Sequence, residues 1–136
     1  MTLSVATIVV AHEADEFLAE TLSQLKKQNH PIHQVMVVDT ANSSETAQLV
    51  SQFDFSIVQP GSLGLGAAIN AGIAALSHRP DWLWILHDDS APEPDALKNL
   101  TKAAETSPSV AIVGPKLLRW DLPIEIQQME IGRAHV

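Results

Sequence analysis

The sequence predicts an α/β fold in which a mostly parallel sheet carries helices on both faces. Short runs of β-branched and apolar residues recur along the chain, and segments with helical spacing of apolar residues separate them. Strict alternation of strands and helices is typical of parallel sheets whose crossovers are helical. The expected strands are residues 4–10, 34–38, 55–58, 82–86 and 110–113.

The first helix is predicted between the first two strands. Pro31 cannot continue a helix, so this helix should be complete by Asn29-His30. Apolar residues and one threonine recur there at helical spacing and should face inward. They are Phe17, Leu18, Thr21, Leu22 and Leu25.

Three further helices complete the predicted alternation. Ser43 or Ser44 can N-cap the second helix, an alanine-rich segment at 66–77 forms the third, and Pro94 suits the first turn of the fourth. The inward residues of the second and fourth helices are Ala47, Val50, Phe53, Leu97, Leu100 and Ala104. Because residues 82–86 (WLWIL) are apolar at every position, we expect that strand to be covered on both faces.

Three of the predicted strands are followed directly by segments that contain polar side chains. These segments are Ala11-His12, Asp39 and His87-Asp88-Asp89. In open parallel sheets, ligands bind beyond the carboxyl ends of the strands. The candidate site is therefore expected where these three strand ends meet.

Asp88 and Asp89 are the residues most suggestive of chemistry. Their side chains should diverge on an extended chain, so that one carboxylate can hold a metal while the other accepts hydrogen bonds from a hydroxyl. Hard divalent cations prefer carboxylate oxygen and often share their shell with substrate phosphates. The alternative interpretation is a strand-end turn with solvated aspartates, which the preceding buried strand disfavours.

Asp39 and a glycine-rich segment allow two interpretations each. Asp39 can accept a hydrogen bond from a base or ribose, or it can open the turn into the next helix. The segment GSLGLGAAINAGI, at 61–73, allows close backbone approach and a phosphate at a helix N-terminus. As a dinucleotide fingerprint it is poor, because Ile69 occupies the third glycine position.

Composition excludes several classes of protein. The chain has 16 acidic and 8 basic residues and a net charge of −8, which argues against a nucleic-acid binder. It has no cysteine, so any metal would take oxygen or imidazole ligands. The N-terminal segment MTLSVATIVV lacks a basic region, and its apolar run is too short to span a bilayer, so we expect a cytoplasmic location.

Four segments, in order, resemble family-2 glycosyltransferases over roughly residues 3–120. They are TIVVAHEADEFLAETLSQL, VMVVDTANSSET, GSLGLGAAINAGI and WLWILHDDSAPEPDAL. The last resembles the DXD segment of that family, with His87 where many members have the first aspartate. The resemblance implies the nucleotide-binding part of the Rossmann-like GT-A fold, C-terminally truncated here.

The family also implies an activity and a set of contacts. It transfers a sugar from a nucleotide-sugar donor, with inversion, to a glycan or lipid-linked acceptor. Carried over, Asp89 holds a Mn²⁺ or Mg²⁺ ion. The implied nucleotide-sugar contacts are Ala11, His12, Glu13, Asp39, Gly64, Asn70 and Asp88.

The resemblance covers only part of such an enzyme. The family's catalytic base lies downstream of this chain, in the acceptor half. Membrane association through that missing part would place the protein at the inner face of the membrane. The segment WLWILHDDSAP separately hints at a role in making cell-envelope glycans. Strands left without neighbours would expose apolar surface, so we expect self-association of this chain alone.

The C-terminal segment EIGRAHV, residues 130–136, matches the translation of a common sequencing-adapter read, GAG ATC GGA AGA GCA CAC GTC. We therefore expect residues 1–129 to form the N-terminal part of the domain and 130–136 to be a non-native tail.

Two other classes of protein remain open on the residues alone. A non-catalytic nucleotide-binding α/β module would share the donor site but lack transfer. A receiver-type signalling domain also gathers aspartates at strand ends, but it needs an acidic pair after the first strand, where this chain has VAHEAD.

Overall fold

A computed structural model describes residues 3–12, 16–106, 109, 111–118 and 126–132. The chain divides into two compact units, Met1–Pro94 and Asp95–Val136. We call them the sheet unit and the hairpin unit. Within the described residues, no helix is long and apolar enough to cross a membrane.

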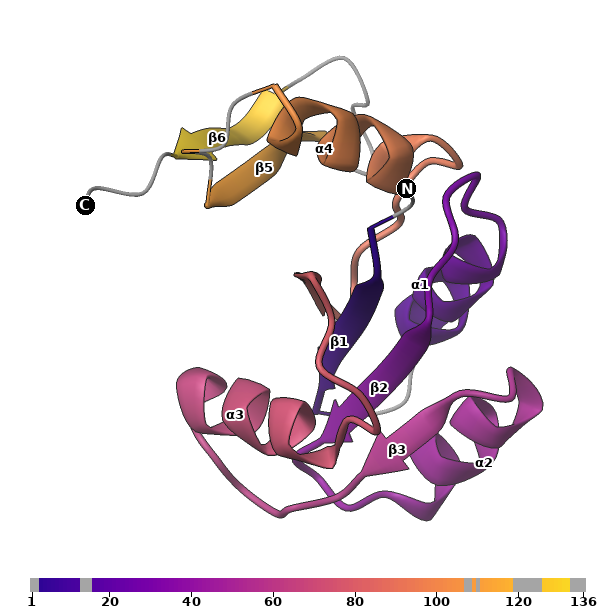
Figure 1. Ribbon diagram of the computed structural model, residues 1–136. Coiled ribbons are helices and arrows are strands. Elements are labelled where there is room, and N and C mark those ends of the chain that lie inside the picture. Colours follow the sequence, from indigo (N-terminus) through magenta and orange to yellow (C-terminus); the bar gives the residue numbers. More distant parts are fainter. Residues whose placement is uncertain (1–2, 13–15, 107–108, 110, 119–125, 133–136) are drawn as a thin grey trace. The chain divides into compact units, whose positions relative to one another are not determined.

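The sheet unit has the predicted alternation of strands and helices (Figure 1). Its sheet has the strand order β3-β2-β1-β4, and every pair is parallel. The elements are β1 (Val5–Ala11), α1 (Glu16–Lys26), β2 (Gln34–Asp39), α2 (Ser44–Gln52), β3 (Ser56–Val58), α3 (Leu65–Ala75) and β4 (Trp82–His87). Ser43 caps α2 as predicted, because its hydroxyl accepts from the backbone N–H of Thr46 at 3.3 Å.

Helices cover both faces of this sheet, with α1 and α2 on one side and α3 on the other (Figure 1). Alternate residues of β1 and β2 face opposite ways, as the period of a strand requires. One core cluster contains Val9, Val37, Leu18, Leu22 and Val50. The other contains Ile8, Met36, Val38 and Ala68. The predicted fold class, α/β with a mostly parallel sheet, is confirmed.

Gly72 lets α3 approach the sheet closely. A Cβ atom at this position would lie 2.7 Å from Cγ2 of Val38 and 3.1 Å from Cγ2 of Ile8. Contacts that short would push the helix away from two core residues. The glycine is therefore a packing requirement of the fold.

The hairpin unit contains α4 (Ala96–Ala104), β5 (Ile112–Leu118) and β6 (Ile126–Gly132). Here the structure differs from the prediction, because β5 pairs antiparallel with β6 in a separate sheet. The pairing is irregular between Val113 and Lys116, where Pro115 has no N–H to donate. β6 was not predicted, since IQQMEIG has no clear strand periodicity. The expected tail boundary after Met129 falls within β6 and stays a prediction.

Three local expectations were wrong. Pro94 precedes α4, whose N-cap is Asp95. Phe17 is 39% exposed, because it lies on the outer side of the first turn of α1. Only one face of β4 is covered, because α3 packs mainly on β1 and β2, and Leu83 and Ile85 are 37% and 46% exposed on the other face.

Candidate functional site

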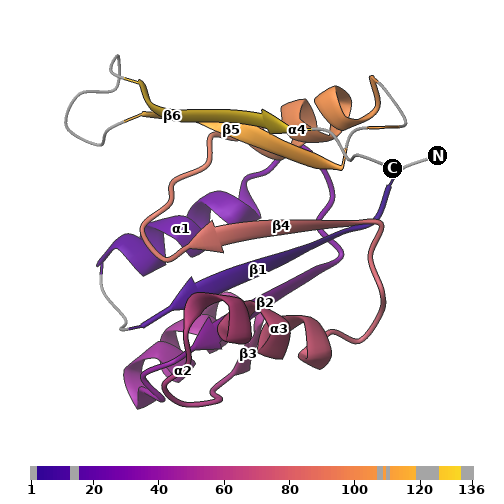
Figure 2. The same cartoon turned by 90° about the vertical axis from the view of Figure 1, so that its left-hand side faces the viewer.

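The predicted strand ends lie next to one another in the sheet unit. Ala11 is opposite Asp39 in the β1–β2 pair, and Val10 is opposite His87 in the β1–β4 pair. Figure 2 shows β1 and β4 pointing toward the same end of the sheet. The ends of β1, β2 and β4 therefore form one edge, as the parallel topology requires.

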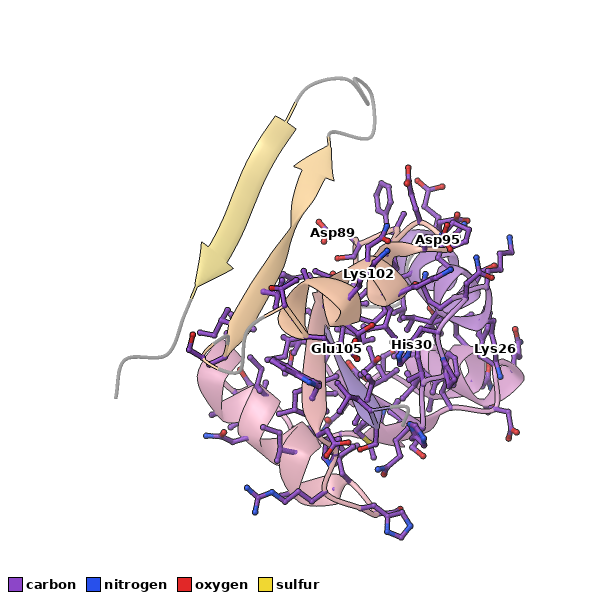
Figure 3. All side chains as sticks on the ribbon, turned by 45° about the horizontal axis from the view of Figure 1, so that its top comes forward. Lys26, His30, Asp89, Asp95, Lys102 and Glu105 are labelled. Atoms are coloured by element: carbon purple, nitrogen blue, oxygen red, sulfur yellow. The ribbon has the colours of Figure 1, made fainter. Side chains whose placement is uncertain are left out.

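Asp88 is tied to the end of β1. Its Oδ2 accepts a hydrogen bond from the backbone N–H of His12 at 3.3 Å. Asp88 is half-buried. The neighbouring Asp89, which is labelled in Figure 3, is exposed. The two carboxylates therefore lie in different surroundings, as the extended chain predicts.

His12 also joins β1 to the residue after β2. Its Nδ1 lies 3.1 Å from the hydroxyl of Thr40. The Thr40 hydroxyl can donate to the carbonyl of Ala11 at 3.3 Å, and its backbone N–H donates to the same carbonyl at 2.9 Å. When the Thr40 hydroxyl donates to the carbonyl of Ala11, it accepts from Nδ1 of His12 in the tautomer whose Nδ1 carries the hydrogen. A continuous set of hydrogen bonds therefore runs from Thr40 through His12 to Asp88.

Asp39 is fully buried, and both of its carboxylate oxygens are hydrogen-bonded. Oδ1 accepts from the backbone N–H of Ala41 at 3.0 Å, and Oδ2 accepts from that of Ser43 at 2.7 Å. Oδ2 also accepts from Nε2 of Gln59 at 3.0 Å. Asp39 thus opens the turn into α2, which was one of its two interpretations. Its contact with a nucleotide base stays a prediction.

Two loops beside Asp39 are joined by side chains. Gln59 also donates to the carbonyl of Ser43 at 2.9 Å. Oδ1 of Asn42 accepts from the backbone N–H of Gly61 at 3.1 Å. Asn42 and Gly61 have φ angles of 52° and 94°, the left-handed conformation that asparagine and glycine tolerate best. The turn after β2 is therefore held against the loop after β3.

The other predicted contacts are less closely tied to this edge. Gly64 is the N-cap of α3, with open space around its α-carbon, and Asn70 is exposed on the same helix. Within the described residues, neither has a hydrogen bond to Asp39 or Asp88. His87 is exposed, and Glu13 lies outside the described residues. The roles predicted for these residues are not tested by the structure.

Sequence reasoning missed three polar residues that support the site: Thr40, Gln59 and Thr21. Thr21 is completely buried in α1, and its hydroxyl lies 3.1 Å from the carbonyl oxygen of Asp88. A threonine among the leucines of an inward helix face was a usable signal, because a buried hydroxyl needs a partner. Thr40 and Gln59 each follow a strand end directly, but nothing in the sequence indicates their partners.

The donor chemistry of this edge fits a hard divalent cation. The side chains of Asp88 and Asp89 offer only oxygen atoms, from their carboxylates, as ligands to a metal. In the part of the chain that the structure describes, no cluster of three or more His, Cys, Asp or Glu residues could enclose a metal. An ion held here would take its other ligands from substrate phosphates and water, which is the usual arrangement for Mg²⁺.

A family model excludes one of the remaining classes of protein. The model described as Glycosyl transferase family 2 matches residues 6–123, which include all elements of the sheet unit except the first residue of β1. This chain belongs to glycosyl transferase family 2. The receiver-type alternative is thereby excluded, and the predicted family is confirmed.

Two relatives agree with this membership. Galactofuranosyltransferase GlfT1 of Mycolicibacterium smegmatis is 30% identical over 124 residues, which cover 88% of this chain and 41% of that protein. The chain thus spans less than half the length of this relative. The corresponding galactofuranosyltransferase of Mycobacterium tuberculosis H37Rv is 30% identical over 93% of this chain and 43% of its own length.

Among solved structures, the mannosyltransferase PcManGT from Pyrobaculum calidifontis, in complex with GDP-Man and Mn²⁺, has a TM-score of 0.73. It is 22% identical, over 88% of this chain and 36% of that one. At this identity the likeness shows the fold alone, and that fold is the GT-A type that the resemblance implies.

Proposed function

We propose that this chain is the donor-binding part of an inverting, metal-dependent glycosyltransferase. It would bind a nucleotide-sugar and transfer the sugar to a glycan or lipid-linked acceptor. The observation that carries the proposal is the meeting of Asp88-Asp89 with His12 and Asp39 at one sheet edge, in a chain of glycosyl transferase family 2.

Asp89 is proposed as the metal ligand because its carboxylate is exposed beside the held Asp88. A bound Mn²⁺ or Mg²⁺ would stabilise the negative charge gained by the leaving nucleoside diphosphate. Asp88, fixed by the N–H of His12, would accept hydrogen bonds from ribose or sugar hydroxyls with its remaining lone pairs.

Asp39, which holds the turn after β2, is proposed to contact the nucleotide base. Both carboxylate oxygens already accept hydrogen bonds from protein groups. A carboxylate has about four acceptor positions, so three occupied ones leave room for one further donor. Because Asp39 is fully buried, that donor would have to approach through the residues that cover the carboxylate.

A transfer assay tests this proposal on the protein at its natural length. UDP- and GDP-sugars, including a galactofuranosyl donor, are incubated with candidate acceptors in Mn²⁺, Mg²⁺ or EDTA. We expect transfer with one donor only in the presence of metal, and a product whose anomeric configuration, read by NMR, is inverted. Donor binding without transfer would favour the non-catalytic nucleotide-binding module, and transfer with retention would contradict inversion.

A further inference from the structure

The segment between β4 and α4 carries the two adjacent aspartates and has little regular structure of its own. It runs from Asp88 to Pro94, and its prolines at 92 and 94 have no N–H. Carbonyl groups here cannot rely on a sheet neighbour, because β4 ends at His87. Their partners come from α1 and the residues that follow it.

Thr21 of α1 contacts the backbone on either side of Asp89. Its hydroxyl contacts the carbonyl oxygen of Asp88 at 3.1 Å and that of Ser90 at a closer distance. It also lies 2.9 Å from the carbonyl of Phe17, the partner usual for a mid-helix threonine. The single hydroxyl hydrogen is shared among these three carbonyls, to only one or two of which it can donate at a time, and the carbonyls of Asp88 and Ser90 flank Asp89. Because Thr21 is fully buried, water cannot take the place of its hydroxyl as the donor to these carbonyls.

Two further groups hold the rest of the segment. Nε2 of Gln28 donates to the carbonyl of Glu93 at 2.8 Å, and the backbone N–H of Asn29 donates to that of Pro94 at 2.8 Å. Donors from α1 and its C-terminal end thus hold the segment at both ends. The backbone that bears Asp89 is therefore held in place by hydrogen bonds to α1 and to the residues that follow it.

We propose that Thr21 is a positioning residue for the metal-binding turn: its buried hydroxyl fixes the backbone on both sides of Asp89 so that the carboxylate is pre-oriented for a divalent cation. This inference rests on the proposed function. Groups that orient a metal ligand commonly change metal affinity by about 10- to 100-fold when they are removed. Thr21 would therefore act on the metal-dependent part of donor binding and leave the base contacts alone.

Calorimetric binding of UDP and GDP, measured in Mn²⁺ and in EDTA, tests the inference in the protein at its natural length. The ratio of the two dissociation constants reports the contribution of the metal. For Thr21→Val, which keeps the shape and removes the hydroxyl, we expect this ratio to fall by about tenfold, with affinity in EDTA unchanged. Thr21→Ser restores the hydroxyl and should retain the ratio.

Thr7→Val is the matched control, because Thr7 is equally buried but its hydroxyl has no partner within the described residues. It should leave the ratio unchanged. A wild-type ratio in Thr21→Val, or an equal loss in Thr21→Val and Thr21→Ser, would overturn the inference. If Thr21→Val does not fold, Gln28→Met, at a half-buried position, replaces it as the test. A lowered ratio supports the inference that donors from α1 and the residues after it hold the segment bearing Asp89. An unchanged ratio contradicts it. Wild-type protein that binds neither nucleotide in Mn²⁺ would instead refute the proposed function.

Discussion

The backbone N–H of His12 donates a hydrogen bond to Oδ2 of Asp88 at 3.3 Å, although 76 positions separate the two residues in sequence. The contact joins the end of β1 to the end of β4, which are neighbours in the sheet. It also explains how two adjacent aspartates can end an apolar strand. One carboxylate is held by a backbone donor, and the exposed one would be neutralised by the proposed cation.

The pair formed by Asp39 and Gln59 should be energetically coupled. Asp39→Ala leaves two backbone N–H groups without their acceptor and should lower the free energy of unfolding by about 2–4 kcal/mol. Gln59→Ala, at an exposed position, should cost about 1 kcal/mol. In the double variant the losses should fall short of their sum by about 1 kcal/mol, measured by urea unfolding. Strict additivity would contradict the hydrogen bond between them.

Gly72 and Gly66 should respond in opposite ways to the same substitution. Gly72→Ala places a methyl group 2.7 Å from Val38 and should destabilise the protein by about 1–3 kcal/mol. Gly66→Ala, in the same helix with open space around it, should be neutral or stabilising by about 0.5 kcal/mol. Thermal unfolding measures both. Equal melting temperatures for the two variants would contradict the close approach of α3.

Thr7→Val should stabilise the fold. The hydroxyl of Thr7 is buried in β1 without a partner among the described residues, so replacing it with a methyl group removes an unsatisfied polar atom. We expect a gain of roughly 1 kcal/mol in the free energy of unfolding. Thr21→Val should instead lose about 1–2 kcal/mol, since its hydroxyl has carbonyl partners. A loss at Thr7 would indicate a hydrogen bond that the structure does not contain.

The exposed face of β4 should promote self-association of the 136-residue chain. β4 is an edge strand, and Leu83 and Ile85 project from it into solvent. Ile85→Lys should lower the fraction of oligomer seen by light scattering, because a charge on an edge strand opposes pairing with a second chain. Leu63→Lys, at an exposed residue outside the sheet, serves as the control and should have a smaller effect.

Sequence alone predicted the sheet unit well, because its strands are apolar and its helices have clear periodicity. β1 and β2 follow this pattern closely, and the strand ends placed Asp39 and Asp88 correctly at one edge. The burial of β4 was mispredicted for a physical reason: an apolar strand does not reveal whether a neighbour covers it. The hairpin of β5 and β6 was missed because Pro115 interrupts one strand and the other, IQQMEIG, lacks a clear strand periodicity.

The inward position of Thr21 could be predicted from the sequence, but the partners of the residues that support the site could not. Thr21, Gln59 and Thr40 act through partners that are distant in the chain or on another loop, so only the folded arrangement reveals them. The resemblance implies that Asp39 contacts the nucleotide, but it could not indicate that the carboxylate also holds its own turn.

Donor binding by Asp89→Asn tests the central claim most directly. Affinity for the preferred UDP- or GDP-sugar is measured by calorimetry in Mn²⁺ and in EDTA, with Glu93→Gln as the control, because Glu93 is an exposed carboxylate in the same segment. We predict that Asp89→Asn abolishes the gain in affinity from Mn²⁺, while Glu93→Gln keeps it. Undiminished metal-dependent binding by Asp89→Asn would contradict the assignment of this carboxylate as the metal ligand.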